Sequence, residues 1–127
     1  MENQKSALGL DGNVTALIGY LIGIVALVLI FIEKDNKFVR FHALQSVMWA
    51  VICTVGLIAV AIVGVILTMV LGAASETLGM ITGGLTFLLY IGIFLVFFGG
   101  LIFAAIKAFG GNEFKLPIVG NMVQKWV

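Results

Sequence analysis

One short segment of the sequence gathers the side chains that could do chemistry. Residues 37 to 46, KFVRFHALQS, combine cations, aromatic rings, a histidine, an amide and a hydroxyl. If the segment is helical, its polar and small side chains recur at steps of three or four residues and share one stripe. The stripe consists of His42, Gln45, Ser46, Trp49, Cys53 and Gly56. In an apolar helix such a stripe faces protein or water, so it predicts interhelical hydrogen bonds or a polar pathway.

Other chemistries find little support in the sequence. A lone histidine defines neither a metal site nor a proton relay, and the chain has no nucleophile elbow, HExxH motif or phosphate-binding glycine loop. Glu33 and Asp35 lie beside cations and are typical of a solvated loop, while Glu76 is typical of a helix start. We therefore predict a protein that is not an enzyme and needs no cofactor and no metal.

The composition indicates that the solvent of this chain is a lipid bilayer. Of its 127 residues, 62% are hydrophobic and 10% are charged, and the mean hydropathy is +1.24. A net charge of +1 makes nucleic acid an unsuitable partner. The single cysteine, Cys53, can form neither a disulfide nor a zinc cluster within the chain. The sequence therefore predicts one integral membrane domain over residues 1–127.

Uncharged runs predict an all-α bundle with three membrane spans. Residues 14–32 are long enough for one crossing, and residues 42–72 and 78–106 each exceed one crossing of a ~30 Å hydrocarbon core. Steep tilt could absorb the excess length of the second run. We favour instead an interfacial start over residues 38–48, because its apolar residues recur at spacings of three and four.

The end of the chain has the period of an amphipathic helix. Over residues 117–127 one predicted face is apolar, with Ile118, Val119, Met122, Val123, Trp126 and Val127. The opposite face holds Gly120, Asn121, Gln124 and Lys125. This pattern predicts a helix in the headgroup plane, and docking on the helical bundle is the alternative.

The first and third predicted spans carry stripes that could pack against the central one. In the first span the stripe is Asn13, Ala16, Tyr20 and Gly23, with the GxxxG motif GYLIG. In the third it is Gly79, Thr82, Thr86 and Tyr90, with the motif GMITG. Small residues let helices approach closely, and hydroxyls can form bonds across the seam. The expected result is packing within one chain or between copies.

Lysine and arginine residues near the predicted span ends are distributed six to one. Six lie in the first loop or in the C-terminal tail, and only Lys5 lies at the N-terminus. Cytoplasmic loops of membrane proteins carry the excess of these residues. The bias predicts a multi-pass protein of the cell membrane, with its N-terminus outside and its C-terminus in the cytoplasm.

The segment NKFVRFHALQSVMW, together with the tail GNEFKLPIVG, resembles a family of small uncharacterised prokaryotic membrane proteins. The specific part of this resemblance is Phe38, Arg40, Phe41, His42, Ala43 and Gln45, and a weaker part is Pro117 and Gly120. That family is distantly similar to the twenty-kilodalton inner-envelope component of the chloroplast protein-import machinery. The resemblance implies a multi-span helical protein without an established activity, and its chloroplast relatives imply a part in protein conduction.

Three functional hypotheses follow. Seams of small residues favour a packing or assembly unit of a membrane complex, with lipid and another membrane protein or a second copy as partners. Protein or peptide translocation is the process that we associate with such a complex. A channel or transporter subunit would be lined by Tyr20, His42, Gln45, Ser46, Thr86 and Tyr90. A protein that recognises anionic lipid would use Lys37, Arg40, Lys125 and Trp126 at headgroup level.

Overall fold

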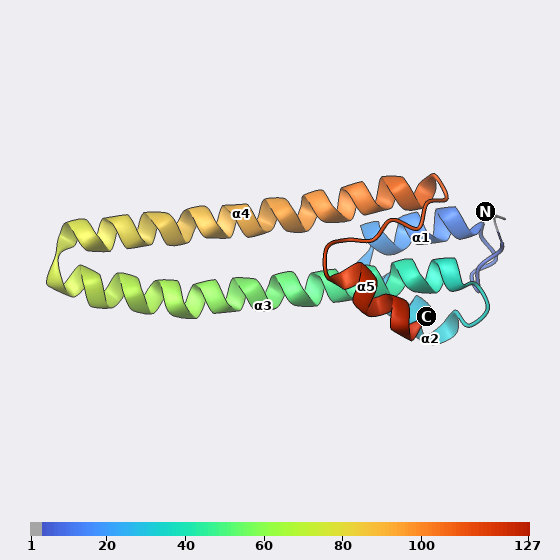
Figure 1. Ribbon diagram of the computed structural model, residues 1–127, viewed down its shortest axis with the longest axis horizontal. Helices are drawn as coiled ribbons and strands as arrows, with labels where there is room; N and C mark the ends of the chain where they lie inside the picture. The colour runs from blue at the N-terminus through green and yellow to red at the C-terminus, as the bar shows by residue number, and fades with distance from the viewer. Residues whose placement is uncertain (1–3) are drawn as a thin grey trace. The chain divides into compact units, whose positions relative to one another are not determined.

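The computed structural model describes residues 4–127, and it is built from helices (Figure 1). Their order is α1 Gly12–Leu21, α2 Gly23–Ile32, α3 Lys37–Ala74, α4 Glu76–Phe109, α5 Val119–Val123 and the short 3₁₀ helix η1 Gln124–Trp126. The predicted all-α class is confirmed. Two of these helices, α3 and α4, are long and apolar enough to cross a membrane.

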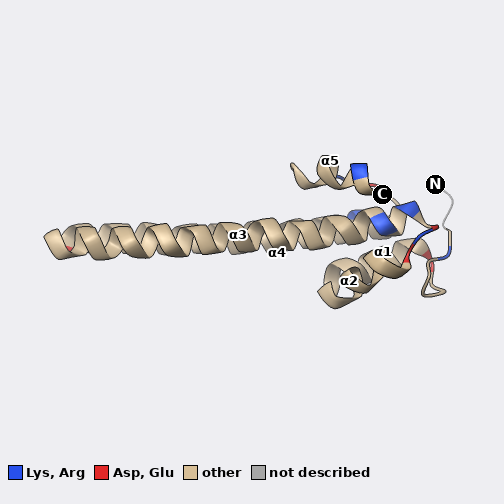
Figure 2. Cartoon of the chain, turned by 90° about the horizontal axis from the view of Figure 1, so that it is seen from below, with Lys and Arg blue, Asp and Glu red and all other residues tan. Residues whose placement is uncertain are grey.

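The contacts within the chain define two compact units. The first unit comprises residues up to Ala50 together with Phe98–Val127, and the second comprises Val51–Phe97. Every lysine and arginine belongs to the first unit, whereas Glu76 is the one charged residue of the second. In Figure 2 the ribbons of the long helices α3 and α4 are accordingly tan over most of their length. The basic residues thus belong to the first unit, and the second unit consists of long apolar segments of α3 and α4.

The structure divides the predicted first span into two helices. The chain leaves helical geometry at Ile22, whose φ and ψ are −125° and 98°, and α1 and α2 are ten residues each. Ala26 and Leu29 of α2 are fully buried, and a Cβ on Gly19 of α1 would lie 3.8 and 3.7 Å from their side chains. Gly19 of α1 therefore faces Ala26 and Leu29 of α2, and the two helices pack together, which a single continuous helix could not do.

The predicted interfacial start and the second span form one helix, α3. It begins after Asn36, whose side-chain Oδ1 accepts a hydrogen bond of 3.2 Å from the backbone N–H of Val39. Phe38, Phe41 and Leu44, which the periodicity placed against lipid, are buried in the first unit. Their apolar spacing indicated a buried face correctly, but protein and not lipid covers it.

The second unit is a helical hairpin with a turn at Ser75, visible as the green-to-orange parts of α3 and α4 (Figure 1). Its helices approach closely at glycines. A Cβ on Gly79 would lie 2.8 Å from the Cα of Gly72, and one on Gly83 would lie 3.5 Å from the Cγ2 of Thr68. Both glycines of the GMITG motif therefore face α3, as expected of a seam of small residues.

The C-terminal helix is shorter than predicted and is partly buried in protein. Val119, Gly120 and Val123 of α5 are buried, while Ile118 and Trp126 are exposed by 79% and 48%. The apolar face predicted to lie in the headgroup plane is therefore divided. The burial of Val119 and Val123 agrees with the alternative considered from the sequence, in which this helix docks on the helical bundle.

Candidate functional site

Three side chains of the predicted stripes meet in the first unit. The Tyr20 hydroxyl lies 2.7 Å from His42 Nδ1 and accepts a 2.7 Å hydrogen bond from Gln45 Nε2. All three residues are at least 97% buried, since their exposed fractions are 3%, 1% and 0%. With Ser46 we call these residues the α3 polar cluster. Hydrogen bonds between helices, one of the two outcomes expected for the stripe, are observed here.

Gln45 also binds a segment that the sequence pattern did not connect with it. Its Nε2 donates a second hydrogen bond, of 2.9 Å, to the carbonyl of Phe114, and its Oε1 accepts one of 2.9 Å from the N–H of Leu116. A Cβ on Gly120 would lie 2.9 Å from the same Oε1. All the hydrogen-bonding groups of this amide are therefore occupied, and three segments of the chain meet at it.

Ser46 binds the end of α1. Its hydroxyl donates a hydrogen bond of 3.1 Å to the carbonyl of Gly19. In an uninterrupted helix that carbonyl would accept from the N–H of Gly23, four residues later. The serine thus satisfies a carbonyl next to the break between α1 and α2, which is a known way of stabilising broken helices in membranes.

His42 is surrounded by aromatic rings. The ring centroids of Phe38, Phe41 and Tyr20 lie 4.4, 5.0 and 5.5 Å from that of His42, all in edge-to-face arrangements. Its Nε2 is buried and has no hydrogen-bond partner within residues 4–127. The histidine is therefore enclosed by the protein, with 1% of its surface exposed.

The remaining predicted polar residues lie elsewhere. Trp49 is buried in the first unit, where a Cβ on Gly100 would come within 2.7 Å of its ring. Thr86 and Tyr90 belong to the second unit, and Thr86 donates a hydrogen bond of 2.8 Å to the carbonyl of Thr82 in its own helix. The structure thus brings together Tyr20, His42, Gln45 and Ser46, but it places Thr86 and Tyr90 in a different unit.

Of the four residues predicted to contact headgroups, Arg40 has partners within the chain. Its Nη1 donates to the carbonyls of Ile30 and Glu33, at 2.8 and 3.0 Å, and so stabilises the end of α2. Lys37 and Lys125 are exposed, as is Trp126. Lipid contact by these four residues stays a prediction.

Glu33 is a buried residue that the sequence did not reveal. It was expected in a solvated loop, but only 2% of its surface is exposed. Its carboxylate accepts hydrogen bonds from the backbone N–H groups of Ala7, at 2.6 Å, and Asn36, at 3.1 Å. Neighbouring cations suggested solvation, whereas the DN pair before a helix could have suggested a cap at Asn36.

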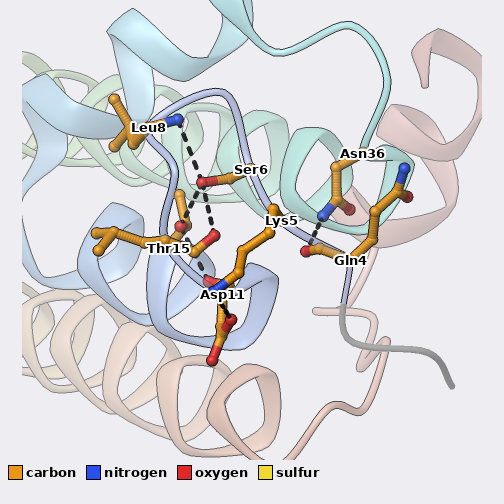
Figure 3. A network of polar contacts seen from close by, with 8 residues as sticks. Gln4, Lys5, Ser6, Leu8, Asp11, Thr15 and Asn36 are labelled. Carbon is orange, nitrogen blue, oxygen red and sulfur yellow. Dashed lines mark hydrogen bonds and ion pairs between the residues drawn. The ribbon is translucent and has the colours of Figure 1, made fainter.

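The N-terminal residues form a second polar network (Figure 3). Lys5 forms an ion pair of 2.6 Å with Asp11, and the hydroxyls of Ser6 and Thr15 lie 2.7 Å apart. The Asn36 side chain donates a hydrogen bond of 2.8 Å to the carbonyl of Gln4. This network holds the N-terminal segment against the start of α1 and the start of α3.

Two apolar grooves follow the seam of the hairpin in the second unit. One has a volume of about 450 Å³ and is bordered by Gly64, Thr82, Thr86 and six aliphatic residues of α3 and α4. The other has about 320 Å³, and its lining includes Thr68, Gly83 and Tyr90. Thr86 and Tyr90 therefore line grooves on the hairpin. Within residues 4–127 no group of three or more His, Cys, Asp or Glu side chains is placed to hold a metal ion.

Comparison with known proteins identifies three relatives that align with more than nine tenths of this chain. UPF0132 membrane protein MJ1443 of Methanocaldococcus jannaschii is 31% identical over 123 residues, which cover 96% of this chain and 94% of the relative. UPF0132 membrane protein MJ1527 of the same organism is 28% identical over 121 residues, covering 94% of this chain and 73% of the relative. A UPF0132 membrane protein of Archaeoglobus fulgidus is 26% identical over 122 residues, which cover 91% of this chain and 94% of the relative.

No solved structure matches the chain. The family described as the magnetosome magnetite crystal formation protein family, MamF/MmsF, matches residues 4–123. This match includes the whole α3 polar cluster and both long helices. The relatives are named membrane proteins, in agreement with the two long apolar helices. The chain is therefore a membrane protein that belongs to the MamF/MmsF family.

Proposed function

We propose that this protein is a non-enzymatic assembly unit of a membrane complex, and that the hairpin over residues 51–97 is its binding element. The observation that carries the proposal is the pair of grooves along the seam of α3 and α4. Hollows beside a seam of small residues can receive the ridge of another apolar helix, since helices in lipid associate by close packing. Thr82 and Thr86 add hydroxyls at the edge of the larger groove.

The outer surface of the hairpin supports the same role. Val55, Met69, Met80 and Leu95 are exposed by 60%, 70%, 73% and 69%, and the most apolar 18-residue window of each long helix is only 6% buried. In a membrane, either lipid chains or apolar helices cover such faces. We propose that helices of another membrane protein, or of a second copy, occupy the grooves while lipid covers the rest.

The first unit lies at the cytoplasmic side of the membrane in this proposal. It carries all seven lysine and arginine residues, so the excess of positive charge favours its cytoplasmic placement, with the C-terminus on that side of the cell membrane. Lys37, Arg40, Lys125 and Trp126 are the proposed contacts with anionic headgroups. A complex that moves proteins or peptides is one assembly for which such a unit is suited.

The channel hypothesis has less support. Tyr20, His42, Gln45 and Ser46 make hydrogen bonds to one another and to backbone groups, and they are buried. A pathway would require these polar groups to face a continuous space. Solute flux through liposomes that contain only this protein would favour the channel over the assembly unit.

Site-specific photocrosslinking in native membranes tests the assembly proposal. A benzophenone amino acid at Leu67, which lines the larger groove, should give a protein adduct of one defined mass. The same probe at Leu95, outside both grooves, should give mainly lipid adducts. Equal protein adducts at both positions, or lipid adducts alone at Leu67, would contradict the proposal.

Filling the groove provides a matched control. Thr82→Phe places a large ring in the larger groove, and we expect it to abolish the Leu67 adduct. Leu88→Phe adds a ring on an exposed part of the same helix outside both grooves, and the adduct should persist. Mass spectrometry of the adduct distinguishes a second copy from another membrane protein.

A further inference from the structure

The helices α1 and α2 are each too short to cross a bilayer. Ten residues of α-helix extend about 15 Å, which is half of a ~30 Å hydrocarbon core. The two helices pack against one another through Gly19, Ala26 and Leu29. Each helix can therefore reach the depth of one leaflet, and the contacts of α2 with α1 and of Glu33 with Ala7 show that the chain folds back at Ile22.

The two ends of this hairpin are held together. The N–H of Ala7, before α1, donates a 2.6 Å hydrogen bond to the carboxylate of Glu33, after α2. The amide of Asn36 is bonded to the carbonyl of Gln4 at 2.8 Å, as Figure 3 shows. Residues in direct contact cannot lie on opposite sides of a bilayer. The topology predicted from the sequence places the N-terminus outside and residues 33–40 inside. These contacts disagree with that prediction, because they join the two segments.

Helix ends leave backbone carbonyls without partners within the helix. In the hairpin of α1 and α2, side chains of α3 bind such carbonyls at the break and at the end of α2. Ser46 donates to the carbonyl of Gly19 next to the break. Arg40 donates to the carbonyls of Ile30 and Glu33 at the end of α2. Interrupted helices are tolerated at membrane depth when protein groups satisfy their backbone in this way.

The outer face of the hairpin is apolar, while its inner face is buried in protein. Leu21, Ile24 and Phe31 are exposed by 63%, 73% and 76%, whereas Ala26 and Leu29 are fully buried. Side chains of this kind at such exposure are suited to the acyl chains of lipid. The basic residues Lys5, Lys34 and Lys37, near the ends of the hairpin, are suited to anionic headgroups.

The distribution of charge supports this arrangement independently. With residues 14–32 as a span, Lys5 lies on the opposite side from the other six lysine and arginine residues. With the hairpin returning to its side of entry, and α3 and α4 as two crossings, all seven share one side and the turn at Ser75 carries none. The positive-inside rule is then satisfied without an exception.

We propose that α1 and α2 form a re-entrant hairpin that inserts into the cytoplasmic leaflet, with the acyl chains of that leaflet as the partner of its outer face. The N-terminus is then cytoplasmic, like the C-terminus. The protein crosses the membrane twice and displaces lipid in one leaflet more than in the other.

Cysteine labelling in a Cys53→Ala background tests the topology. Leu8→Cys, Asp35→Cys and Glu76→Cys place single thiols at exposed positions before α1, after α2 and at the far turn. With a membrane-impermeant maleimide, the first two should react in inverted vesicles and the third in intact cells. Reaction of the Leu8→Cys thiol from the same side as the Glu76→Cys thiol, complete or partial, would overturn the proposal.

A second measurement tests insertion into the leaflet. A nitroxide attached in the Ile24→Cys variant in liposomes should collide more with oxygen, which dissolves in lipid, than with a water-soluble nickel chelate. The same label in the Asp35→Cys variant is the aqueous control and should show the reverse preference. If the Ile24→Cys label prefers the nickel chelate, the hairpin lies outside the hydrocarbon and the proposal fails. All the labelled positions are exposed, and the exchange of the buried Cys53 in the background is common to every labelled variant.

Discussion

The side chain of Gln45 binds the backbone of Leu116, 71 residues later in the chain, with its Oε1 2.9 Å from the leucine N–H. The other end of the same amide donates to the carbonyl of Phe114 and to the hydroxyl of Tyr20. One side chain of α3 therefore connects the segment before α5 with α1. The charged and polar C-terminal segment is part of the fold of the first unit.

The variant Gln45→Met should release this connection. It keeps the length of the side chain but leaves the N–H of Leu116 and the carbonyl of Phe114 without partners, at about 1 to 3 kcal/mol for each buried group. We expect a lower free energy of unfolding in mild detergent and faster tryptic cleavage after Lys115. The exposed Gln124→Met is the matched control and should behave like the unmodified protein. Equal cleavage rates for Gln45→Met and the unmodified protein would contradict this account.

The variant Ser46→Ala should destabilise the break between α1 and α2. Removing the hydroxyl leaves the Gly19 carbonyl without its donor, at a cost of about 1 to 2 kcal/mol. The control is Thr82→Ala, because the Thr82 hydroxyl binds carbonyls within its own helix and its loss should cost less than about 0.5 kcal/mol. Denaturation in SDS measures both. If the two variants lose the same stability, the serine has no special role at the break.

The seam of the hairpin predicts opposite effects for two glycines of α4. A Cβ on Gly79 would lie 2.8 Å from the Cα of Gly72, so Gly79→Ala must push two backbones apart and should cost about 1 to 3 kcal/mol. A Cβ on Gly84 would have no atom within 4 Å, and Gly84→Ala should be neutral or slightly stabilising because alanine favours helix. Unfolding free energies in the same detergent compare them. A larger loss for Gly84→Ala would refute this seam.

The variant Ile118→Gly should stabilise the C-terminal segment. Ile118 has a φ of 67° and a ψ of −55°, between Pro117 and Val119, where a 2.7 Å hydrogen bond joins the Val119 N–H to the Pro117 carbonyl. A branched residue is strained at positive φ by about 1 to 3 kcal/mol, and glycine avoids that strain at an entropic cost of about 0.5 to 1 kcal/mol. Since the side chain is 79% exposed, little packing is lost. Ile118→Ala keeps the Cβ and is the control; a gain for alanine equal to that for glycine would argue against backbone strain.

The sequence predicted the polar stripe because its chemistry is local. Gln45 and Ser46 follow His42 by about one helical turn in an apolar run, and lipid offers such polar groups no hydrogen bonds. Tyr20 was expected as a partner from its own stripe, and the bonds between the two helices are observed. The partners at Phe114 and Leu116 were missed, because backbone N–H and carbonyl groups are the same in every residue and leave no pattern in the sequence.

The sequence by itself determined that this chain is helical and associated with a membrane, because the length of its uncharged apolar runs and the scarcity of charge can be counted along the sequence. It also determined that Glu76 is the one charged residue between Arg40 and Lys107. Only the tertiary structure decided that residues 14–32 form two helices and that Glu33 is buried. Nineteen uncharged residues favour one span when considered alone. The break at Ile22 is stabilised by Ser46, and the return of the chain by Arg40 and the contact between Glu33 and Ala7. These contacts join residues distant in sequence, so they depend on packing that no local pattern records.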